Sequence, residues 1–449
     1  MNRIANAIVD VSHILDVWLP TRVGLSDISG LSVAIAYKGK ILYKKGFGYA
    51  DVEKKIKAKE NTIYHIASIS KTFTAVAILQ LEEKGLLKLD DKASKYVTWF
   101  KGENKNGDLK NITIRQLLSN TSGVWRDGDT PHWTTGKFPK SLKSASKDIL
   151  VFKPSSEFKY SNYGFSILGE VITAVTGLSY EEYARKNIIN SLKLNSTHPD
   201  YKDSIQNLAS GYGKEERGST REKFGHYKAN AYMPASGFLS SAIDLAKYAY
   251  YLSPKADESI LKKASKKKMM KPHRKTEGKD KYCLGLEEYK IDKRKINEHG
   301  GGFQGFATKM AFDRENEITV AVLANCTHSP VSSIASSIFD AIYSLIDGES
   351  KYKSKKKIKY DMYEGVYRNL WGNDVVVRAG KALVQFSLYS HAPLRGDNKQ
   401  FLEPTGEDQF VVKGGSVFHS RGEIVRFSNL KNGKFQLRSI GPTPSKRIV

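Results

Sequence analysis

Cysteine is scarce in this sequence: 449 residues contain only Cys283 and Cys326. Two cysteines are too few for a disulfide framework, and neither belongs to a Cys-x-x-Cys or Cys/His cluster, which argues against a structural zinc site. No run of eighteen apolar residues occurs, so we expect no transmembrane helix. The first twenty residues lack a continuous apolar stretch with a small-residue cleavage site. We therefore expect no signal peptide and a cytoplasmic location.

Acidic residues are also few, because 47 Asp and Glu face 72 Lys and Arg, for a formal charge of +25. Such an excess is typical of proteins that bind nucleic acid or an anionic surface. Here the positive charge is spread along the chain, and lysine outnumbers arginine, which reads bases better. The pattern favours a solvated basic surface, so we expect neither nucleic acid nor membrane as a partner.

The remaining composition, with 40% hydrophobic and 11% aromatic residues, is that of an ordered globular protein. The length of 449 residues predicts two domains. Alternating apolar residues predict a β-hairpin with strands near 31–37 and 40–46, and a second hairpin within 307–324. Between them, apolar residues at helical spacing predict a long helical region. This order favours an α/β domain in which both ends of the domain build one antiparallel sheet that is covered by helices.

The character of the sequence changes near residue 349. Residues 349–359 are a basic run with almost no core-forming residues, which predicts a solvated linker. Residues 360–449 contain six or more short alternating strands separated by Gly, Asn and Lys, a pattern typical of a small antiparallel barrel. The predicted domains are therefore 1–348 and 360–449, joined by the linker 349–359.

The stretch "YHIASISKTFTA" raises the first functional candidate, because Ser68 precedes Lys71 by three residues. On a helix this spacing puts both side chains on one face, and a buried lysine of lowered pKa can take the proton of a serine nucleophile. The Ser-x-x-Lys spacing alone is weak, because this lysine-rich chain repeats it elsewhere, for example at Ser156 and Ser265. Ser68 differs in opening a well-patterned amphipathic helix over 69–85. A helix-start serine beside a solvated lysine stays open as the alternative.

Two further segments are candidates. Tyr160 and Asn162 are two residues apart in a turn, so their side chains point the same way in an extended conformation. His299 is followed by three glycines and a strand, and glycines let a backbone approach a ligand closely. Gly300, Gly302 and Gly305 match G-x-G-x-x-G, but a dinucleotide fingerprint must open a helix, and a strand is predicted here. The alternatives are that Tyr160 and Asn162 belong to an ordinary aromatic turn and that His299 has a structural role.

Taken together and in order, these segments resemble the class C β-lactamase-like serine hydrolases, which include family VIII esterases, DD-carboxypeptidases and D-aminopeptidases. The resemblance covers about residues 20–345. Its motifs are "GKILYKKGFGYAD", "YHIASISKTFTAVAILQLEEKGLLKLDD", "ITIRQLLSNTSGV", "KYSNYGFSILGEVI", "PASGFLSSAIDLAKY" and "HGGGFQGF". It implies an antiparallel sheet flanked by helices, with a largely helical second lobe. The C-terminal barrel is similar to accessory domains of some relatives.

The resemblance implies roles for individual residues. Ser68 would be the nucleophile, Lys71 its proton acceptor, Tyr160 the partner general acid and base, and Asn162 would orient Lys71 and the substrate. His299 stands where many members have a lysine. The stretch 300–302 would bind substrate and contribute Gly302 N–H, with Ser68 N–H, to the oxyanion hole. No metal or organic cofactor is implied.

Two departures bear on the substrate, which the resemblance implies is a small ester, amide or peptide, including D-amino-acid peptides. Many members have a hydroxyl where this chain has Gly300, and losing one charge-assisted hydrogen bond to a substrate carboxylate costs about 1.5–3 kcal/mol. We therefore do not expect strong β-lactamase activity. Asn120 replaces a common histidine in a loop that we expect to support the site. A penicillin-binding β-lactamase or DD-carboxypeptidase, and a non-catalytic scaffold, stay as alternatives, and a homo-oligomer is compatible with the sequence.

Overall fold

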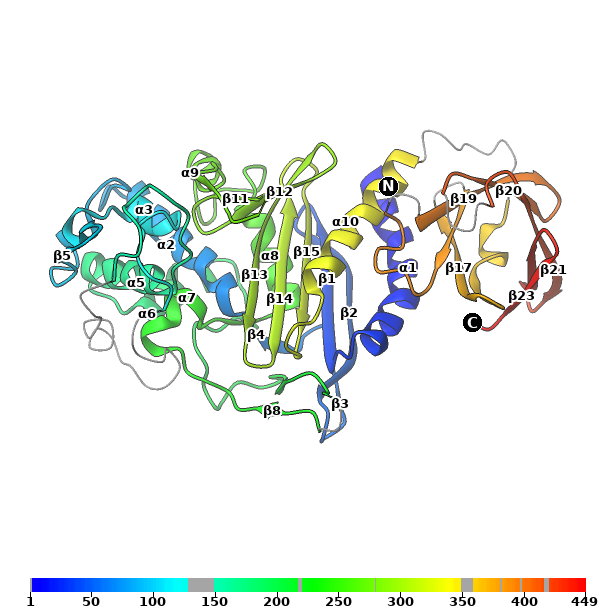
Figure 1. Ribbon diagram of the computed structural model, residues 1–449, viewed down its shortest axis with the longest axis horizontal. Coiled ribbons are helices and arrows are strands. Elements are labelled where there is room, and N and C mark those ends of the chain that lie inside the picture. Colours follow the sequence, from blue (N-terminus) through cyan, green and yellow to red (C-terminus); the bar gives the residue numbers. More distant parts are fainter. Residues whose placement is uncertain are drawn as a thin grey trace. The chain divides into compact units, whose positions relative to one another are not determined.

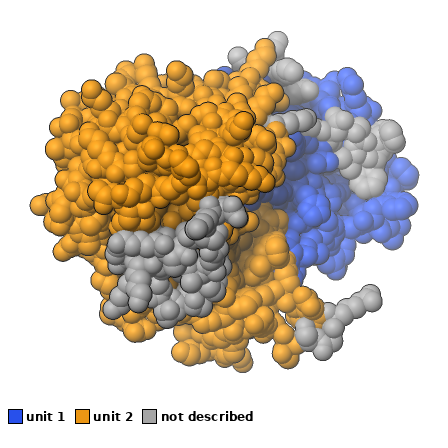
Figure 2. Space-filling view, turned by 60° about the vertical axis from the view of Figure 1, so that its left-hand side comes forward, with its two compact units in different colours: residues 1–27, 332–449 blue, residues 28–331 orange. Residues whose placement is uncertain are grey.

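The computed structural model describes residues 2–127, 149–216, 220–278, 280–348, 358–379, 382–395, 398–415 and 420–449. They form two compact units, one of Ile28–Val331 and one that joins Met1–Asp27 to Ser332–Val449 (Figure 2). This grouping assigns the first and last helices to the barrel unit, whereas the boundaries expected from the sequence were 348 and 360. Those boundaries stay a prediction, because most of the expected linker, residues 349–357, lies outside the described residues.

The larger unit contains an antiparallel sheet in the order β10-β11-β12-β13-β14-β15-β1-β2-β3. Its strands are β1 (Gly30–Tyr37), β2 (Lys40–Asp51), β3 (Ile56–Lys57), β10 (Arg274–Lys275), β11 (Lys281–Tyr282), β12 (Glu287–Ile291), β13 (Arg294–Phe303), β14 (Phe306–Asp313) and β15 (Ile318–Ala324). β1 pairs with β15 from the far end of the unit. The expected sheet built from both ends is therefore confirmed.

The first hairpin follows from local chemistry. Lys38 and Gly39 connect β1 to β2, and both have positive φ, at 50° and 75°. A two-residue turn of this kind matches the right-handed twist of the strands that it joins. Glycine adopts the positive φ of the second position with no steric cost. Every residue of β1 is buried, as expected for a central strand.

Helices surround this sheet. Figure 1 shows a helical lobe that contains α2, α3, α5, α6 and α7 beside the sheet, while α8 packs against strands β1 and β15. The helices are α2 (Ser70–Glu83), α3 (Ile114–Leu118), α5 (Asn162–Thr176), α6 (Tyr180–Ala184), α7 (Met233–Ser236), α8 (Ala242–Leu252) and α9 (Lys263–Met269). The capping box predicted at Ser179 and Glu182 is present at the start of α6. Ser241, one of the two expected caps, begins α8.

Helix α2 runs through the middle of the hydrophobic core. All residues from Ser70 to Leu81 are buried, among them Phe73, whose ring stacks on Tyr248 at 3.9 Å between centroids. A helix that is buried all round cannot move without breaking this packing. The core therefore holds Lys71, in the first turn of α2, and Ser68, directly before α2, in one fixed position.

The second unit contains α1 (Arg3–Leu25), α10 (Val331–Gly348) and a barrel. Its described strands close in the order β16 to β23. Their bounds are β16 (Gly365–Asn369), β17 (Gly372–Ala379), β18 (Ala382–Ser387), β19 (Lys399–Gly406), β20 (Gln409–Lys413), β21 (Ile424–Lys431), β22 (Lys434–Ile440) and β23 (Thr443–Arg447). Trp18 of α1 donates from Nε1 to Ser390 O at 2.9 Å, which ties that helix to the barrel. The predicted C-terminal barrel is confirmed.

Membrane insertion through a helix finds no support in the part of the chain that the structure describes. None of the helices there combines the length with the apolar character that crossing a bilayer requires.

Candidate active site

Ser68 lies in a 3-10 turn, η1 (Ala67–Ile69), directly before α2. Ala67 has φ of 44°, in the left-handed region that residues with a Cβ rarely adopt. Ser70 Oγ donates to Ala67 O at 2.5 Å and accepts from Phe238 N at 3.0 Å, so Ser70 is buried and holds the turn. Ser68 is the partly exposed serine of the pair. The strained turn thus presents Ser68 at the surface of a rigid core.

Lys71 is fully buried one turn below Ser68. Its Nζ donates to Asn162 Oδ1 at 2.6 Å, to Ala235 O at 2.8 Å and to Ser68 Oγ at 3.3 Å. The helical spacing places Lys71 beside Ser68, and the other two acceptors come from α5 and α7. The sequence-predicted pair is therefore brought together, and the lysine is directed inward rather than into solvent.

The surroundings of Lys71 lower the pKa of its amine well below the ordinary lysine value. Burial is the largest cause, because an ammonium group loses its hydration there. The carboxylate of Asp127 opposes this effect, and the positive charge of Arg126 adds to it. An amine with a lowered pKa becomes neutral at a lower pH and can then accept a proton from a neighbouring hydroxyl.

Tyr160 and Asn162 flank Ser161, whose backbone is extended at φ −141° and ψ 112°. The two flanking side chains therefore point the same way, as the sequence predicted. Ser161 begins α5, because its Oγ accepts from Gly164 N at 2.8 Å. Lys71 Nζ lies 4.7 Å from the centre of the Tyr160 ring. The phenol, amide and amine thus converge on one place.

Burial raises the pKa of the Tyr160 phenol, and a hydrogen bond with Ser68 acts in the opposite direction. The phenol therefore stays protonated at neutral pH. Because the pKa of Lys71 is lowered while that of Tyr160 is raised, the lysine is the stronger candidate for the first proton acceptor.

The loop that contains Asn120 supports the Tyr160 turn. Asn120 Oδ1 accepts from Ser161 N at 3.0 Å, and its backbone oxygen accepts from Lys159 N at 2.8 Å. Asn120 has φ of 53°, a conformation that asparagine tolerates better than most residues. The exchange of a common histidine for Asn120 therefore leaves this support intact.

The glycine run lies on β13, against the turn that precedes Ser68. A Cβ on Gly301 would lie 2.1 Å from Ile66 O and 2.4 Å from Thr308 Oγ1, so only glycine fits there. A Cβ on Gly300 would come no closer than 3.8 Å to Lys309 Nζ, and one on Gly302 would meet no described atom within 4 Å. The hairpin that follows also removes the dinucleotide interpretation, because β13 continues into β14 and no helix begins at the glycines.

His299 is buried on the same strand and carries no charge at neutral pH. Burial is the main cause that lowers the pKa of its imidazole to about 3, and the positive charge of Lys71 adds to the effect. Its Nδ1 is 2.7 Å from Gly300 O and must carry the proton, which leaves Nε2 to accept from Tyr282 OH at 3.4 Å. His299 therefore does not replace the charge of the lysine that many relatives have there.

Some residues at this site were not identified from the sequence. Asp127 Oδ1 accepts from Asn162 Nδ2 at 2.6 Å, which turns the amide oxygen of Asn162 toward Lys71. Ala235 contributes only its backbone oxygen, and Tyr282 contacts His299 from another strand. None of the three stands in a pattern of its own, although the motif "PASGF" contains Ala235. Only the folded chain shows their roles.

An aromatic cluster lies beside the Ser68 turn and the end of β13. The ring of His65 stacks on Tyr227 at 4.5 Å between centroids, and Tyr227 meets the edge of Phe303 at 4.2 Å. His226 and Tyr201 stack at 5.0 Å and extend the cluster. Phe303 follows Gly302 directly, so these rings, here called the aromatic wall, adjoin the glycine run. His65 and Tyr227 are buried, and Phe303 is the partly exposed ring of that stack. Burial lowers the pKa of His65 to about 3, so this ring is uncharged.

No metal-binding site is evident among the described residues. They contain no group of three or more His, Cys, Asp or Glu side chains arranged to hold a metal ion. Independently of this, the convergence of Ser68, Lys71 and Tyr160 supports the chemistry of a nucleophilic hydroxyl with an amine as its base.

Comparison with known proteins shows the family of this chain. The sequence model of the family described as Beta-lactamase matches residues 20–342. The chain is 40% identical over 197 residues to Protein flp of Staphylococcus aureus, an alignment that covers 43% of this chain and 39% of that protein. The match thus spans about two fifths of the length of this curated relative.

Two solved structures extend the likeness. The octameric penicillin-binding protein homologue from Pyrococcus abyssi is 27% identical with a TM-score of 0.65, over 96% of this chain and 99% of that one. A D-stereospecific amidohydrolase from Streptomyces has a TM-score of 0.62 at 24% identity, over 74% of this chain and 98% of that one, which shows the fold alone. The first of these likenesses includes both units of the present chain.

Proposed function

Because this chain belongs to the β-lactamase family, we propose that it is a serine hydrolase that forms an acyl-enzyme on Ser68 and hydrolyses small esters, amides or peptides. One observation carries the proposal. The Nζ atom of buried Lys71 lies 3.3 Å from Ser68 Oγ and 2.6 Å from Asn162 Oδ1, so the amine is fixed beside the hydroxyl that it would activate.

In this mechanism, neutral Lys71 accepts the proton of Ser68 while Ser68 Oγ attacks the substrate carbonyl. Protonated Lys71 is then stabilised by Asn162 and by the carbonyl oxygen of Ala235, which accept its hydrogen bonds. Tyr160 stays a neutral phenol and donates its proton to the leaving group, after which Lys71 restores it. Water then attacks the acyl-enzyme while Lys71 accepts a proton from it. As the product leaves, a proton passes from Lys71 back to Ser68 Oγ.

The developing oxyanion would be bound by the backbone N–H groups of Ser68 and Gly302. Two features support this assignment. Ser68 stands at the start of a long helix, whose amide dipoles favour negative charge. Gly301 lets β13 approach the turn before Ser68 more closely than any other residue would, which brings the strand alongside the nucleophile.

The substrate class follows from what the site offers. The aromatic wall next to Phe303 favours an acyl group with an apolar or aromatic side chain. His299 is uncharged and Gly300 has no hydroxyl, so these two residues of β13 offer a substrate carboxylate neither a positive charge nor a hydroxyl donor. We therefore propose esterase or amidase activity ahead of β-lactam turnover. D-amino-acid amides and peptides, which the family resemblance includes, are tested beside simple esters.

Labelling with a fluorophosphonate or a penicillin-type probe tests the nucleophile. The parent should be labelled, and Ser68→Ala should lose all labelling while keeping its thermal stability. Ser156→Ala is the matched control, because Ser156 has the same spacing to a lysine but is exposed and donates to Lys153 O. Equal labelling of Ser68→Ala and the parent would refute the assignment. Parallel assays with p-nitrophenyl esters, D-amino-acid amides and nitrocefin rank the substrates, and no turnover in any of them would favour a non-catalytic scaffold.

The assembly of the protein is a separate proposal. The penicillin-binding protein homologue from Pyrococcus abyssi, similar over nearly the whole chain, is described as octameric. We propose that the present chain also forms a homo-oligomer, which light scattering of the purified protein would test.

A further inference from the structure

The interior of the C-terminal barrel has two chemically different ends. One end is filled by apolar and aromatic side chains: Tyr360, Tyr363, Tyr367, Val376, Leu383, Leu402, Phe410, Val412, Val425, Phe427 and Phe435. Along β17, β18 and β19, the positions two residues from Val376, Leu383 and Leu402 carry Asp374, Gln385 and Gln400, which share the inward face. Packing alone would favour apolar residues at such positions, so the polar end requires another explanation.

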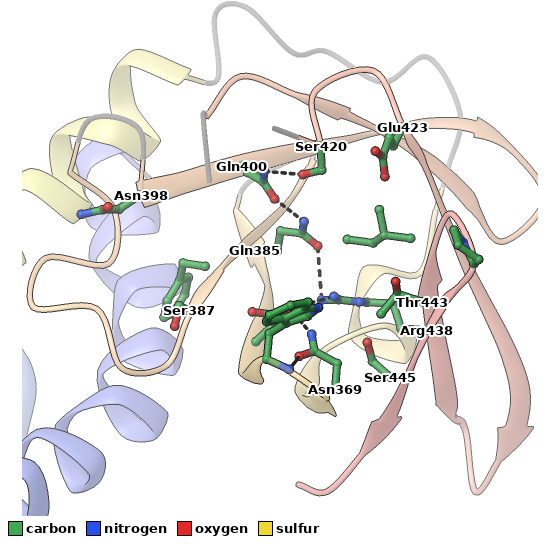
Figure 3. Close-up of a pocket in the computed structure, with 15 residues that line it drawn as sticks. Asn369, Gln385, Ser387, Asn398, Gln400, Ser420, Glu423, Arg438, Thr443 and Ser445 are labelled. Atoms are coloured by element: carbon green, nitrogen blue, oxygen red, sulfur yellow. Dashed lines mark hydrogen bonds and ion pairs between the residues drawn. The ribbon is translucent and has the colours of Figure 1, made fainter. Parts of the chain in front are cut away.

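These inward side chains are linked by hydrogen bonds (Figure 3). Ser420 Oγ accepts from Gln400 Nε2 at 2.7 Å, and Gln400 Oε1 accepts from Gln385 Nε2. Gln385 Oε1 accepts from Arg438 Nη1 at 3.3 Å, and Arg438 Nη2 forms an ion pair with Asp374 at 2.8 Å. Arg438 is only 2% exposed. The network therefore fixes a buried guanidinium inside the barrel.

Two buried donors at this end of the barrel remain unused, one on Arg438 of the network and one on the neighbouring Ser445. Arg438 Nε and Ser445 Oγ are buried and have no hydrogen-bond partner within the described part of the chain. The two residues lie opposite each other on β22 and β23, so they face the same space. A buried donor without an acceptor destabilises the folded protein. Both groups line a cavity of about 370 Å³, which has room for an acceptor brought by a ligand.

The other side of the cavity carries a carboxylate. Figure 3 shows Glu423 reaching toward the cavity from a different part of the wall than Arg438. Because Asp374 already neutralises Arg438, Glu423 leaves the lining with net negative charge. Ile440 and Pro442 add apolar surface, and Trp371 lies at the cavity with 77% of its area exposed. The lining thus offers donors, an anion and apolar contact at separate places.

We propose that this end of the barrel binds a small zwitterion, namely a free amino acid or a dipeptide with an apolar side chain. Its carboxylate accepts hydrogen bonds from Arg438 Nε and Ser445 Oγ, and its ammonium group pairs with Glu423. Its side chain lies against Ile440 and Pro442. The interior of an eight-stranded barrel is either filled by side chains or holds one small ligand, and here a cavity of about 370 Å³ is left for such a molecule. The site is separate from Ser68, and the proposal does not rest on the hydrolase activity.

Binding to the full-length protein is measured by calorimetry and by the change in tryptophan fluorescence expected from Trp371. The probes are L-valine, D-valine and glycyl-valine, with 3-methylbutanoate as the analogue that lacks the amine and isobutylamine as the analogue that lacks the carboxylate. At least one zwitterion should bind saturably, and both analogues should bind at least tenfold more weakly. Failure of every zwitterion to saturate, or equal binding of either analogue, overturns the proposal.

Two variants of the cavity lining and two control variants locate the site. Ser445→Ala and Glu423→Gln should each weaken binding at least fivefold, because each removes one polar contact. Glu407→Gln is the matched control, since Glu407 is an exposed carboxylate of the same barrel that does not line the cavity. Ser68→Ala should bind as the parent does, which distinguishes the barrel from the candidate active site. Unchanged affinity in both Ser445→Ala and Glu423→Gln, with folding verified by thermal denaturation, overturns the proposal.

Discussion

The side-chain oxygen of Asn162 lies 2.6 Å from Lys71 Nζ, although 91 positions separate the two residues in the sequence. Asp127 in turn accepts a hydrogen bond from the amide nitrogen of Asn162 at 2.6 Å. Because an amide that donates on one side must present its oxygen on the other, Asp127 sets the acceptor that Lys71 meets. This chain of contacts links the charge of Asp127 to the amine beside Ser68.

Asp127→Asn should test that link. The substitution removes a negative charge that raises the pKa of Lys71, so the pKa of Lys71 should fall further and the rise of kcat with pH should move to lower pH. The new amide oxygen can still accept from Asn162 Nδ2, but the hydrogen bond is no longer charge-assisted, so the plateau value of kcat should fall about fivefold. A lower plateau with an unmoved midpoint would mean that Asp127 acts on folding only.

The pH profile of the parent is a second prediction. Burial lowers the pKa of Lys71, and only the neutral amine accepts a proton, so kcat/KM should rise with pH through the pKa of Lys71 and then level off. Lys71→Arg should be inactive over the whole range, because a guanidinium group stays protonated. The measurement is ester hydrolysis from pH 5 to 10, and a flat parent profile would contradict Lys71 as the base.

His299 should contribute no inflection to that profile. Since the pKa of its imidazole is lowered to about 3, the ring does not change its charge between pH 5 and 8. His299→Gln, which keeps an uncharged polar side chain, should therefore change the height of the profile and leave its shape as in the parent. A parent inflection near pH 6.5 that disappears in His299→Gln would show that the ring is charged during catalysis.

Alanine substitutions at Gly301 and Gly302 form a matched pair of tests for the approach of β13 to the Ser68 turn. A Cβ at Gly301 would collide with Ile66 O at 2.1 Å, so Gly301→Ala should push β13 away from the Ser68 turn and lower kcat about a hundredfold, as expected for a displaced oxyanion donor. Gly302→Ala adds a methyl group where no described atom lies within 4 Å and should keep kcat within a few-fold. Similar losses in both variants would contradict the close approach at Gly301.

The aromatic wall makes a prediction about specificity. Phe303→Ala removes the ring that Tyr227 contacts at 4.2 Å and opens space beside the glycine run. The ratio of kcat/KM for a phenylacetyl ester to that for an acetyl ester should fall about tenfold, since burial of an aromatic group contributes a few kcal/mol at most. The same ratio in Leu86→Ala, which alters an exposed residue at the end of α2, should stay unchanged. An unchanged ratio in Phe303→Ala would show that the aromatic wall does not contact the acyl group of the substrate.

Much of the fold could be predicted because its signals are local. Alternating apolar residues marked β1 and β2, and Lys38-Gly39 has the chemistry of a tight hairpin turn. The helix after Ser68 was recognisable from its apolar spacing, and that spacing also placed Lys71 beside the serine. The grouping of α1 and α10 with the barrel had no such signal, because an amphipathic helix does not specify which surface it covers.

The sequence by itself determined that Ser68 and Lys71 share one helix face and that Tyr160 and Asn162 point the same way, because helix and strand periodicity fix the direction of each side chain. That these two pairs meet in one site was implied only by the family resemblance. Tertiary structure alone decided that Asp127 and the carbonyl of Ala235 meet at Lys71, and that Arg438 and Ser445 face a cavity with donors left over. These relations depend on contacts between segments far apart in the chain. No local periodicity encodes them, because packing of the whole core sets the distances.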